Sequence, residues 1–467
     1  MSLTIQADTA NQKNIPSLLE EMGYSVPCNC FGAHRCNGAR YPFDCSLIPK
    51  APVTIDWEPE QYDIQGLSLD SLPLSDGVGD TMLIDIGTTT VAFALISRTE
   101  KKLHRRSTIE NPQRRFGADV IARIHSSCRG NGEQLQAVLI QAIKSETSRL
   151  CSNNSQTEET ITKCYIGGNT TMIHLLFGYD CTPLSRSPFN IRQTLPERFC
   201  LQQCEIHIAP WFSAFVGGDI CAGLYACRLW ETKETCLFLD LGTNGEIVLS
   251  HSGTHYATST AAGPAFEGGN LSCGCASVPG AVSQVVLRRM NPQLKTIGNK
   301  LPIGLCGSGA ISLVAELLRK GYVTNEGILT EKFPLQGIHL ATTASGTKLL
   351  FTADDLRNIQ LAVAAIAAGI DTLLHEAGIV SSDVSRIYLG GSFGFHITGE
   401  DCQTLGLFSS LDCHSLQPVG NSCLQGLYRC ATEDIDLSAT HDVVTINLAE
   451  SNYFQQQFLT HMKFPDS

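Results

Sequence analysis

MLIDIGTTTVAFALI, residues 82–96, places two short apolar runs on either side of the polar turn DIGTTT. A second segment, CLFLDLGTNGEIVLS at residues 236–250, repeats this arrangement around the turn DLGTNG. Short apolar runs that flank a glycine-containing turn predict two buried strands joined by a tight connection. Because the unit occurs twice, the sequence predicts two similar half-domains that face one cleft.

Each turn begins with an aspartate, Asp85 in the first and Asp240 in the second. A carboxylate at the end of a buried strand can hold Mg²⁺ through water, while backbone N–H groups of the turn bind phosphate oxygens. Glycine suits such turns because a phosphate must approach the backbone closely. No GxxxxGK[ST] or GxGxxG loop follows the first strand, which disfavours a P-loop or a dinucleotide-binding fold. The alternative is that both turns are ordinary Asp-Gly turns.

A third glycine-rich loop ends the segment SRIYLGGSFGF, residues 385–395. Such a loop lets a flat base or a ribose lie against the backbone. Elsewhere apolar strands alternate with helices, which we predict over 133–151 and over 354–377, the second opened by the capping pattern Thr352-Ala-Asp-Asp. This alternation is typical of α/β proteins.

Two phosphate turns and an adenosine loop in this order resemble the acetate kinase, sugar kinase, Hsp70 and actin superfamily. The resemblance implies an α/β, actin-like ATPase fold with two ribonuclease-H-like half-domains around a nucleotide cleft. Here the half-domains would be residues 81–235 and 236–467, the second with a C-terminal return helix.

The composition indicates a soluble globular protein. Of 467 residues, 43% are hydrophobic and 17% charged, which excludes a mainly disordered chain. The 45 acidic and 33 basic residues give a net charge of -12, which argues against nucleic acid or an anionic membrane as a partner. The opening MSLTIQADTANQKN lacks the apolar core of a signal peptide, and the apolar stretch 361–370 is too short to cross a bilayer. We therefore expect a cytoplasmic location.

The chain contains 20 cysteines, an unusually large number. In the reducing cytoplasm they are expected to stay free, pack in cores or bind metal rather than form a disulfide scaffold. Cys28, Cys30, Cys36 and Cys45 lie close together, ahead of a stretch from 51 to 80 that is rich in Pro, Asp, Ser and Gly. That stretch is predicted to be a linker, so residues 1–50 form a separate Cys-rich region.

From Thr81 to the C-terminus the chain resembles a narrower group, the reductive activators of corrinoid proteins, in their C-terminal ATPase domain. The resemblance rests on long motifs, which are NPQRRFGADVIARI (111–124), GGNTTMIHLLFG (167–178), FVGGDI (215–220), DLGTNGEIVLS (240–250), STAAGPAFEGGNLSCG (259–274), GLCGSGAISLVAELL (304–318), YLGGSFG (388–394) and LAESNYFQQQFLTHMKFP (448–465). It implies an ATP-hydrolysing activase that returns an oxidised cob(II)amide in a corrinoid protein or methyltransferase to the cob(I)amide state. Members of the family carry a [2Fe-2S] ferredoxin-like domain that delivers the electron.

The same resemblance assigns roles to individual positions. Asp85 and Asp240 would organise Mg²⁺ and the attacking water. The residues that would contact the nucleotide are Gly87, Thr88, Thr89, Thr90, Gly242, Thr243 and Asn244 at the phosphates, Gly391, Ser392 and Gly394 at the adenosine, and Glu267 and Ser308 at the border. Asp219 is either catalytic or part of a capped turn, and Asn169 and Thr170 either line or brace the cleft. Cys273, Cys275 and Cys306 lie beside these loops and are expected to pack as small hydrophobes.

The N-terminal region departs from the family pattern. Relatives carry C-x5-C-x2-C for the cluster, whereas here Cys30 and Cys36 fit and the third position is Ala39. Three outcomes stay open: Cys28 or Cys45 completes a [2Fe-2S] site, the four cysteines and His34 bind zinc, or the region holds no metal. A region of about fifty residues is also short for a complete ferredoxin fold, so the electron could come from an external donor.

Alternative functions also remain open. One is an ATP-gated activator of another radical or iron-sulfur enzyme, of the 2-hydroxyacyl-CoA dehydratase type, which holds one [4Fe-4S] cluster between two subunits. Another is a nucleotide-dependent scaffold without catalysis. A small-molecule kinase is disfavoured because no segment offers the carboxylate and Asn/Arg set expected for a sugar. A homodimer is compatible with the sequence.

Overall fold

The computed structural model describes residues 79–152, 160–192, 204–242, 244–288, 291–412, 416–437 and 442–466. The predicted Cys-rich region, with Cys28, Cys30, Cys36 and Cys45, lies outside the described residues, as does all of the predicted linker before residue 79. The two predicted half-domains are described over most of their length.

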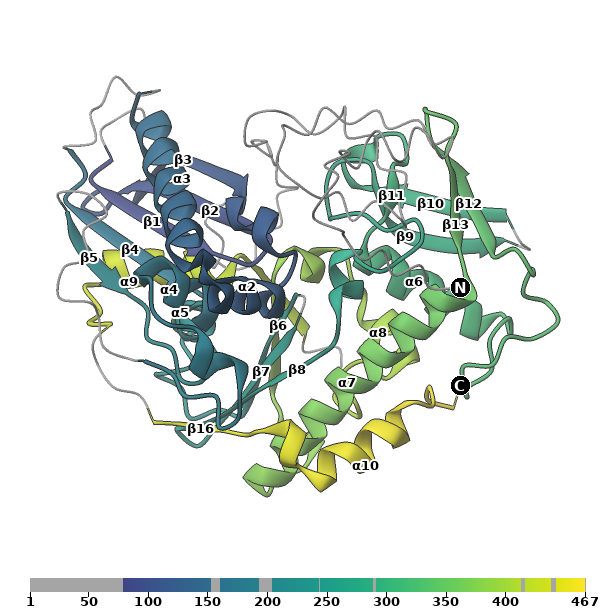
Figure 1. The fold of residues 1–467 in the computed structure, drawn as a ribbon. Helices are drawn as coiled ribbons and strands as arrows, with labels where there is room; N and C mark the ends of the chain where they lie inside the picture. Colours follow the sequence, from purple (N-terminus) through teal and green to yellow (C-terminus); the bar gives the residue numbers. More distant parts are fainter. Residues whose placement is uncertain are drawn as a thin grey trace, which may run out of the picture. The chain divides into compact units, whose positions relative to one another are not determined.

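The first half of the chain builds a five-stranded sheet in the order β3-β2-β1-β4-β5 (Figure 1). Its strands are β1 (Thr81–Ile86), β2 (Thr90–Ser97), β3 (Lys102–Glu110), β4 (Lys163–Gly168) and β5 (Glu205–Ile208). β2 pairs antiparallel with β1 and β3, whereas β4 pairs parallel with β1 and β5. The two strands predicted around DIGTTT are β1 and β2, and the turn joins them as expected.

The second half builds a six-stranded sheet in the order β15-β14-β6-β7-β8-β16. Its strands are β6 (Cys236–Leu241), β7 (Gly245–His251), β8 (Thr254–Thr260), β14 (Arg386–Gly390), β15 (Leu416–Gly420) and β16 (Val443–Thr445). The strands β8, β7, β6, β14 and β15 correspond in order to β3, β2, β1, β4 and β5 of the first sheet. Each neighbouring pair has the same parallel or antiparallel direction as its counterpart. The repeated turn motif therefore reflects a repeated half-domain, which confirms the predicted actin-like architecture.

Strand alternation explains why both aspartates face the interior of the molecule. In β1, Met82, Ile84 and Ile86 pack against the helices outside the sheet, so Leu83 and Asp85 point to the opposite face. In β6 the same alternation sends Leu237, Leu239 and Leu241 outward and leaves Phe238 and Asp240 on the inner face. The two inner faces are turned toward the helices that lie between the sheets.

Those central helices are α5 (Gly218–Ala226) and α9 (Ser422–Thr432), which follow β5 and β15 in the repeated order. Cys221 and Ala222 of α5 share a buried cluster with Leu83 of the first sheet, while Ile220 and Leu224 share one with Phe238 of the second. α9 comes from the second half of the chain but packs in the cluster of the first sheet, through Leu424 and Leu427. The two halves are thus joined through this pair of helices.

The outer faces of the sheets carry the remaining helices. These are α2 (Val120–Ser126), α3 (Gly132–Ser152) and α4 (Thr170–Phe177) on the first half, and α6 (Gly307–Arg319), α7 (Ala353–Ala377), α8 (Gly399–Leu405) and α10 (Asn452–His461) on the second. The helices predicted over 133–151 and 354–377 are α3 and α7, and Thr352 with Asp355 forms the predicted capping box. α10 packs along α7 through the hydrogen bond from His461 to Asp371, 2.7 Å long (Figure 1).

Smaller elements complete the second half. A three-stranded sheet of β9 (Ala281–Arg288), β10 (Asn291–Thr296) and β11 (Gly304–Leu305) and a hairpin of β12 (Ile338–Thr342) and β13 (Lys348–Phe351) are inserted between β8 and α7. Short 3-10 helices span Pro112–Phe116 (η3), Thr182–Ser185, Pro264–Glu267, Ile297–Asn299, Ser381–Asp383, Ser392–Phe395 (η10) and Leu448–Glu450, and a π-helical turn spans Ser127–Asn131.

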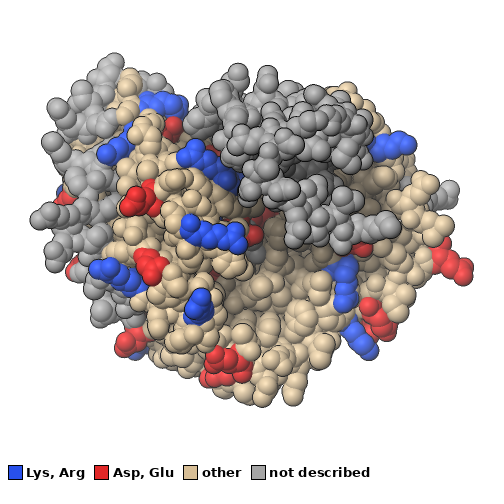
Figure 2. All heavy atoms as spheres, viewed as in Figure 1, with Lys and Arg blue, Asp and Glu red and all other residues tan. Residues whose placement is uncertain are grey.

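α7 is the one described helix that is long and apolar enough to cross a membrane by length and composition. However, 78% of its most apolar window is buried inside the fold. Its hydrophobicity is accounted for by packing in the core of the second half. On the face drawn in Figure 2, Lys and Arg are interspersed with Asp and Glu over the described surface, in keeping with the mixed charge of the sequence.

We expect Gly426→Ala to destabilise the protein, because α5 and α9 cross closely at this point. A Cβ at position 426 would lie 1.8 Å from the carbonyl oxygen of Ala222, so the helices would have to move apart. Overpacking of this kind costs about 1–3 kcal/mol, which should appear as a lower Tm in thermal unfolding. The matched control is Gly132→Ala in α3, where the nearest atom is the flexible Oγ of Ser127 at 3.2 Å. A Tm for Gly426→Ala equal to that of the control would contradict the close crossing.

Candidate active site

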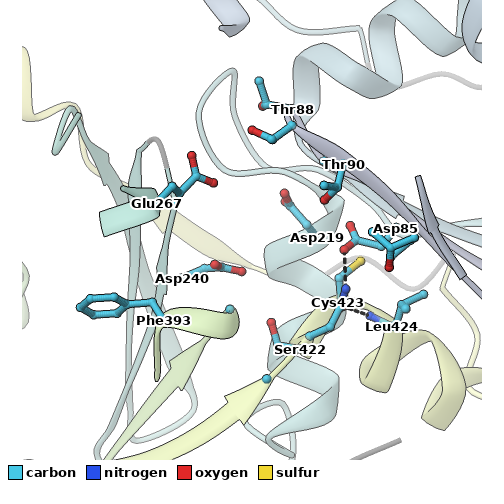
Figure 3. A pocket seen from close by; sticks show the side chains of 18 of the residues that line it. Asp85, Thr88, Thr90, Asp219, Asp240, Glu267, Phe393, Ser422, Cys423 and Leu424 are labelled. Atoms are coloured by element: carbon cyan, nitrogen blue, oxygen red, sulfur yellow. Dashed lines mark hydrogen bonds between the residues drawn. The ribbon is translucent and has the colours of Figure 1, made fainter. Parts of the chain in front are cut away.

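A cavity of about 460 Å³ opens where the two repeated turns approach the ends of α5 and α9. Figure 3 shows Asp85, Thr88 and Thr90 on one side of it, Asp240, Glu267 and Phe393 on the other, and Asp219 between them. The predicted residues that line this cavity are Asp85, Gly87, Thr88, Thr89, Thr90, Asp240, Gly242, Asn244, Glu267 and Gly391. The structure therefore brings residues of both turns and of the third loop to one place.

Four other predicted residues are not part of this lining. Thr243 lies outside the described residues, and Ser392 begins η10 without a described side chain. Ser308 is buried in the first turn of α6, with its Oγ 3.3 Å from the Sγ of Cys306. Gly394 packs against β14, where an added Cβ would lie 3.0 Å from the carbonyl oxygen of Leu389. Ser308 and Gly394 thus lie behind the cavity wall.

Asp85 stands at the end of β1 and is held by the C-terminal half of the chain. The side-chain amide of Asn421 donates to its Oδ2 at 2.9 Å, and the Oδ1 of the same Asn421 accepts from the N–H of Leu424 at 2.7 Å. Burial raises the pKa of Asp85, although the hydrogen bonds from Asn421 and Cys423 act to lower it. Asn421 therefore fixes the Asp85 carboxylate while it caps the start of α9.

Asp219 is placed in the cavity by the first turn of α5. Its Oδ1 accepts from the N–H of Ile220 at 2.9 Å, so the side chain is fixed by its own helix. Burial, together with the neighbouring Asp85 and Asp240 carboxylates, raises the pKa of Asp219 to about 8. Burial, with Asp85 and then Glu267, raises the pKa of Asp240 to about 7. Near neutral pH these carboxyl groups resist simultaneous ionisation, and at least one of them is poised to exchange a proton.

Besides Asp85, Asp219, Asp240 and Glu267, the carboxyl group of Glu246 also lines this acidic cavity. Glu246 lies directly across the ladder from Asp240 in β7, and its Oε1 accepts a 3.2 Å hydrogen bond from the hydroxyl of Ser259. Burial, with Asp219 and Asp240, raises the pKa of Glu246 well above its usual range. Ionisation of Glu246 is therefore disfavoured by its surroundings.

The cavity offers little fixed positive charge to an anionic ligand. Among the described lining residues, Arg106 is the one Lys or Arg side chain. The other electropositive groups are backbone N–H groups of the turns and the N-terminal ends of α4, α5 and α9, where Asn169, Asp219 and Ser422 line the cavity. Thr88 adds a hydroxyl donor, because its Oγ1 already accepts a 2.9 Å hydrogen bond from Asn169 and its proton is left to donate.

A divalent cation fits this set of side chains. Carboxylates whose pKa values are raised by one another and by burial are stabilised by a cation placed among them, and oxygen is the ligand that Mg²⁺ prefers. No group of three or more His, Cys, Asp or Glu side chains in the described part of the chain is arranged to ligate one ion directly. Mg²⁺ would therefore be held mainly through water and through the phosphates of its ligand, as is usual for this ion.

Sequence reasoning missed Asn421, Ser422 and Cys423, which all line the cavity. The signal was present, because β15 runs into VGNSC just as the first half runs into VGGDI before α5. Asn169 and Thr170 were expected to share one role, either lining or bracing the cleft. In the structure Asn169 lines the cavity, whereas Thr170 is buried and donates to the carbonyl oxygen of Ser213 at 2.6 Å. Pairing the motifs of the two halves would have found α9.

The cysteines beside these loops show no sign of ligation in the described part of the chain. Burial raises the pKa of Cys273 to about 12, and it raises the pKa of Cys275 to about 12 as well. Both thiols are therefore neutral at physiological pH. Cys306 is fully buried, and its thiol lies 3.2 Å from the carbonyl oxygen of Val282.

Comparison with known proteins identifies related chains along the whole described region. The family described as the C-terminal, ASKHA domain of RACo matches residues 234–467, and the RACo middle region matches residues 81–232. The corrinoid activation enzyme RamQ of Eubacterium limosum is 28% identical over 82% of this chain and 70% of its own. The [Co(II) methylated amine-specific corrinoid protein] reductase of Methanosarcina barkeri is 29% identical over 44% of this chain and 41% of its own. The solved structure of a reductive activator for a corrinoid, iron-sulfur protein matches with a TM-score of 0.73 and 28% identity, over 84% of this chain and 67% of that one.

Proposed function

The chain belongs to the RACo family, and on that premise we propose that it is an ATP-dependent reductive activator that returns an oxidised cob(II)amide in a partner protein to the cob(I)amide state. The observation that carries the proposal is the convergence of both aspartate turns and Asp219 on one cavity, in a chain whose relatives act on corrinoid proteins. The partner would be a corrinoid protein or its methyltransferase.

In this proposal the ATP phosphates lie between the two turns. Asp85 and Asp240 would hold the water shell of Mg²⁺. The N–H groups of Thr88, Thr89 and Asn244 would bind the phosphate oxygens, because those of Gly87 and Gly242 already donate to the carbonyl oxygens of Thr90 and Asn244. The cation supplies charge neutralisation at the phosphates when it is bound. The adenosine would lie toward Gly391 and Phe393. Gly391 has a φ of 77°, which favours glycine, and because it carries no side chain a flat ligand can approach its backbone closely.

Asp219 is proposed as the base for hydrolysis. The attacking water transfers a proton to the Asp219 carboxylate as its oxygen bonds to the γ-phosphorus, and the bond from that phosphorus to the oxygen of ADP breaks. A pKa of about 8 makes the ionised form of Asp219 an effective acceptor near neutral pH. Asp85, which is already bonded to Asn421, is better suited to hold the water shell than to exchange protons.

Nucleotide binding would act on the partner through closure of the two halves about α5 and α9. Ligand contacts that exist only in the closed state can drive such a change. The closed state would favour transfer of one electron to cobalt, a step for which ATP turnover is needed because the cobalt potential is very low. The electron would come from a cluster at Cys28, Cys30, Cys36 and Cys45, or from an external donor if those cysteines hold zinc or no metal.

The experiment that tests this function is ATP hydrolysis by the purified protein with and without a cob(II)amide-loaded partner. We expect slow hydrolysis alone and faster hydrolysis with the loaded partner, but not with the cob(I)amide form, which needs no reduction. Stimulation by a 2-hydroxyacyl-CoA dehydratase instead would favour the alternative activator type. Phosphorylation of a small molecule would favour a kinase and overturn the proposal. We also propose a cytoplasmic location.

A further inference from the structure

The segment NPQRRFGADVIARI, residues 111–124, contributes no residue to the described lining of the cavity. It passes through η3 and then α2, and it lies against the DIGTTT turn by way of two side chains. Asn111 stands at the start of η3, and Arg123 lies within α2. Neither is explained by nucleotide contact.

Both residues bond to backbone carbonyl groups of the turn. The side-chain amide of Asn111 donates to the carbonyl oxygen of Gly87 at 2.7 Å, and Nη2 of Arg123 donates to that of Thr88 at 2.6 Å. The backbone N–H of Asn111 donates to the carbonyl oxygen of Thr89 at 2.9 Å. Three consecutive carbonyl groups are therefore held by one segment.

This arrangement determines where the N–H groups of the turn point. In a trans peptide the C=O of one residue and the N–H of the next lie on opposite sides of the bond. With the carbonyl groups of Gly87 and Thr88 drawn toward Asn111 and Arg123, the N–H groups of Thr88 and Thr89 face the other way, where these residues line the cavity. A set of N–H groups directed at one point is a binding site for an anion.

We propose that Arg123 and Asn111 are positioning residues that direct the Thr88 and Thr89 N–H groups at the phosphates of the bound nucleotide. This inference rests on the proposed function, because it assumes that the nucleotide phosphates occupy the cavity. In this proposal the 111–124 segment supports the phosphate site from outside the cavity, through its contacts with the turn.

The environment of Arg123 supports a role beyond ordinary packing. Its side chain is fully buried, and its other partners are the carbonyl oxygen of Gly117 at 3.0 Å and the sulfur of Met172 at 3.1 Å. It forms no ion pair with any residue that the structure describes. Burial, with repulsion from Arg114, lowers its pKa to about 10. The nearby Asp119 carboxylate acts to raise the pKa, but less strongly than burial and Arg114 lower it. A buried charge that no ion pair neutralises is unfavourable for folding, so a purely structural role would be better served by an apolar residue.

The test is the binding of two ligands to Arg123→Met, Arg123→Lys and Asn111→Ala, measured by titration calorimetry. The first ligand is the magnesium complex of a non-hydrolysable ATP analogue, and the second is adenosine, which lacks phosphates. We expect the Kd of the ATP analogue to rise by about tenfold or more in Arg123→Met and Asn111→Ala, with a smaller rise in Arg123→Lys, while the Kd of adenosine changes less than about twofold.

Arg98→Met is the matched control, because Arg98 lies in the same half but pairs with Asp434 instead of the turn, and neither residue lines the cavity. It should leave both affinities unchanged. The result that overturns the inference is a Kd that rises equally for both ligands, or for neither, in the lysine and alanine variants. Both variants must first be shown to fold normally, and the lysine variant keeps the positive charge. If the unaltered protein binds adenosine but not the ATP analogue, the proposed function fails as well.

Discussion

Asp219→Asn is expected to lower kcat for ATP hydrolysis by about 10²- to 10⁴-fold, the usual contribution of a general base, while MgATP binding is kept or strengthened. The amide cannot accept the proton of the attacking water. The substitution also removes a carboxyl group, whose pKa is raised to about 8 by burial and by Asp85 and Asp240. The acidic cavity should therefore repel the phosphates less. The measurement is steady-state phosphate release together with an independent Kd for the nucleotide.

The pH profile separates this role from a structural one. The base must be ionised, so kcat/KM of the unaltered protein should rise with pH through the window from about 7 to about 8, where Asp240 and Asp219 ionise as a coupled set. In Asp219→Asn that rise should flatten. Asp354→Asn, an exposed position at the start of α7, is the control and should keep both the rate and the profile. An unchanged kcat in Asp219→Asn would remove Asp219 from the mechanism.

Removal of divalent cations is expected to weaken ATP binding by about 100-fold or more, which corresponds to about 2.7 kcal/mol. The cavity brings Asp85, Asp219, Asp240 and Glu246 together, and Arg106 is the one cationic side chain among its described lining residues. A polyphosphate without its cation would therefore meet carboxylates at close range, in a partly buried site where repulsion is strong.

This expectation can be measured as the Kd for ATP in chelator and again after Mg²⁺ or Mn²⁺ is restored. Adenosine serves as the control ligand, because it carries no phosphate and its affinity should not respond to the cation. Equal ATP affinity with and without chelator would show that the carboxylates do not face the phosphates through a metal ion.

The sequence was most informative where local pattern and fold agree. In β1 the apolar positions on either side of Asp85 alternate with it, so the pattern alone predicts a strand that turns the carboxylate away from the outer helices. The capping box at Thr352 fixed the start of α7 in the same way, because both of its hydrogen bonds are local.

Contacts between distant parts of the chain could not be predicted in this way. Asn421 donates a hydrogen bond to Asp85, although the two residues are 336 positions apart in the sequence. The sequence around each residue contains no local pattern that predicts this contact. The reverse case is Ser308, whose glycine-rich surroundings resemble a ligand loop. Gly307 lacks a side chain because an added Cβ would lie 2.0 Å from the carbonyl oxygen of Phe266, so these glycines serve close packing. Only the three-dimensional arrangement separates the two uses of glycine.

The most direct test of the account is anaerobic spectroscopy of a cob(II)amide-loaded partner mixed with this protein and a low-potential donor. The appearance of cob(I)amide is followed with MgATP, without it, and with Asp219→Asn in place of the unaltered protein. We expect cob(I)amide to form only with MgATP and the unaltered protein. Formation at the same rate without MgATP, or no formation under any of these conditions, would contradict it.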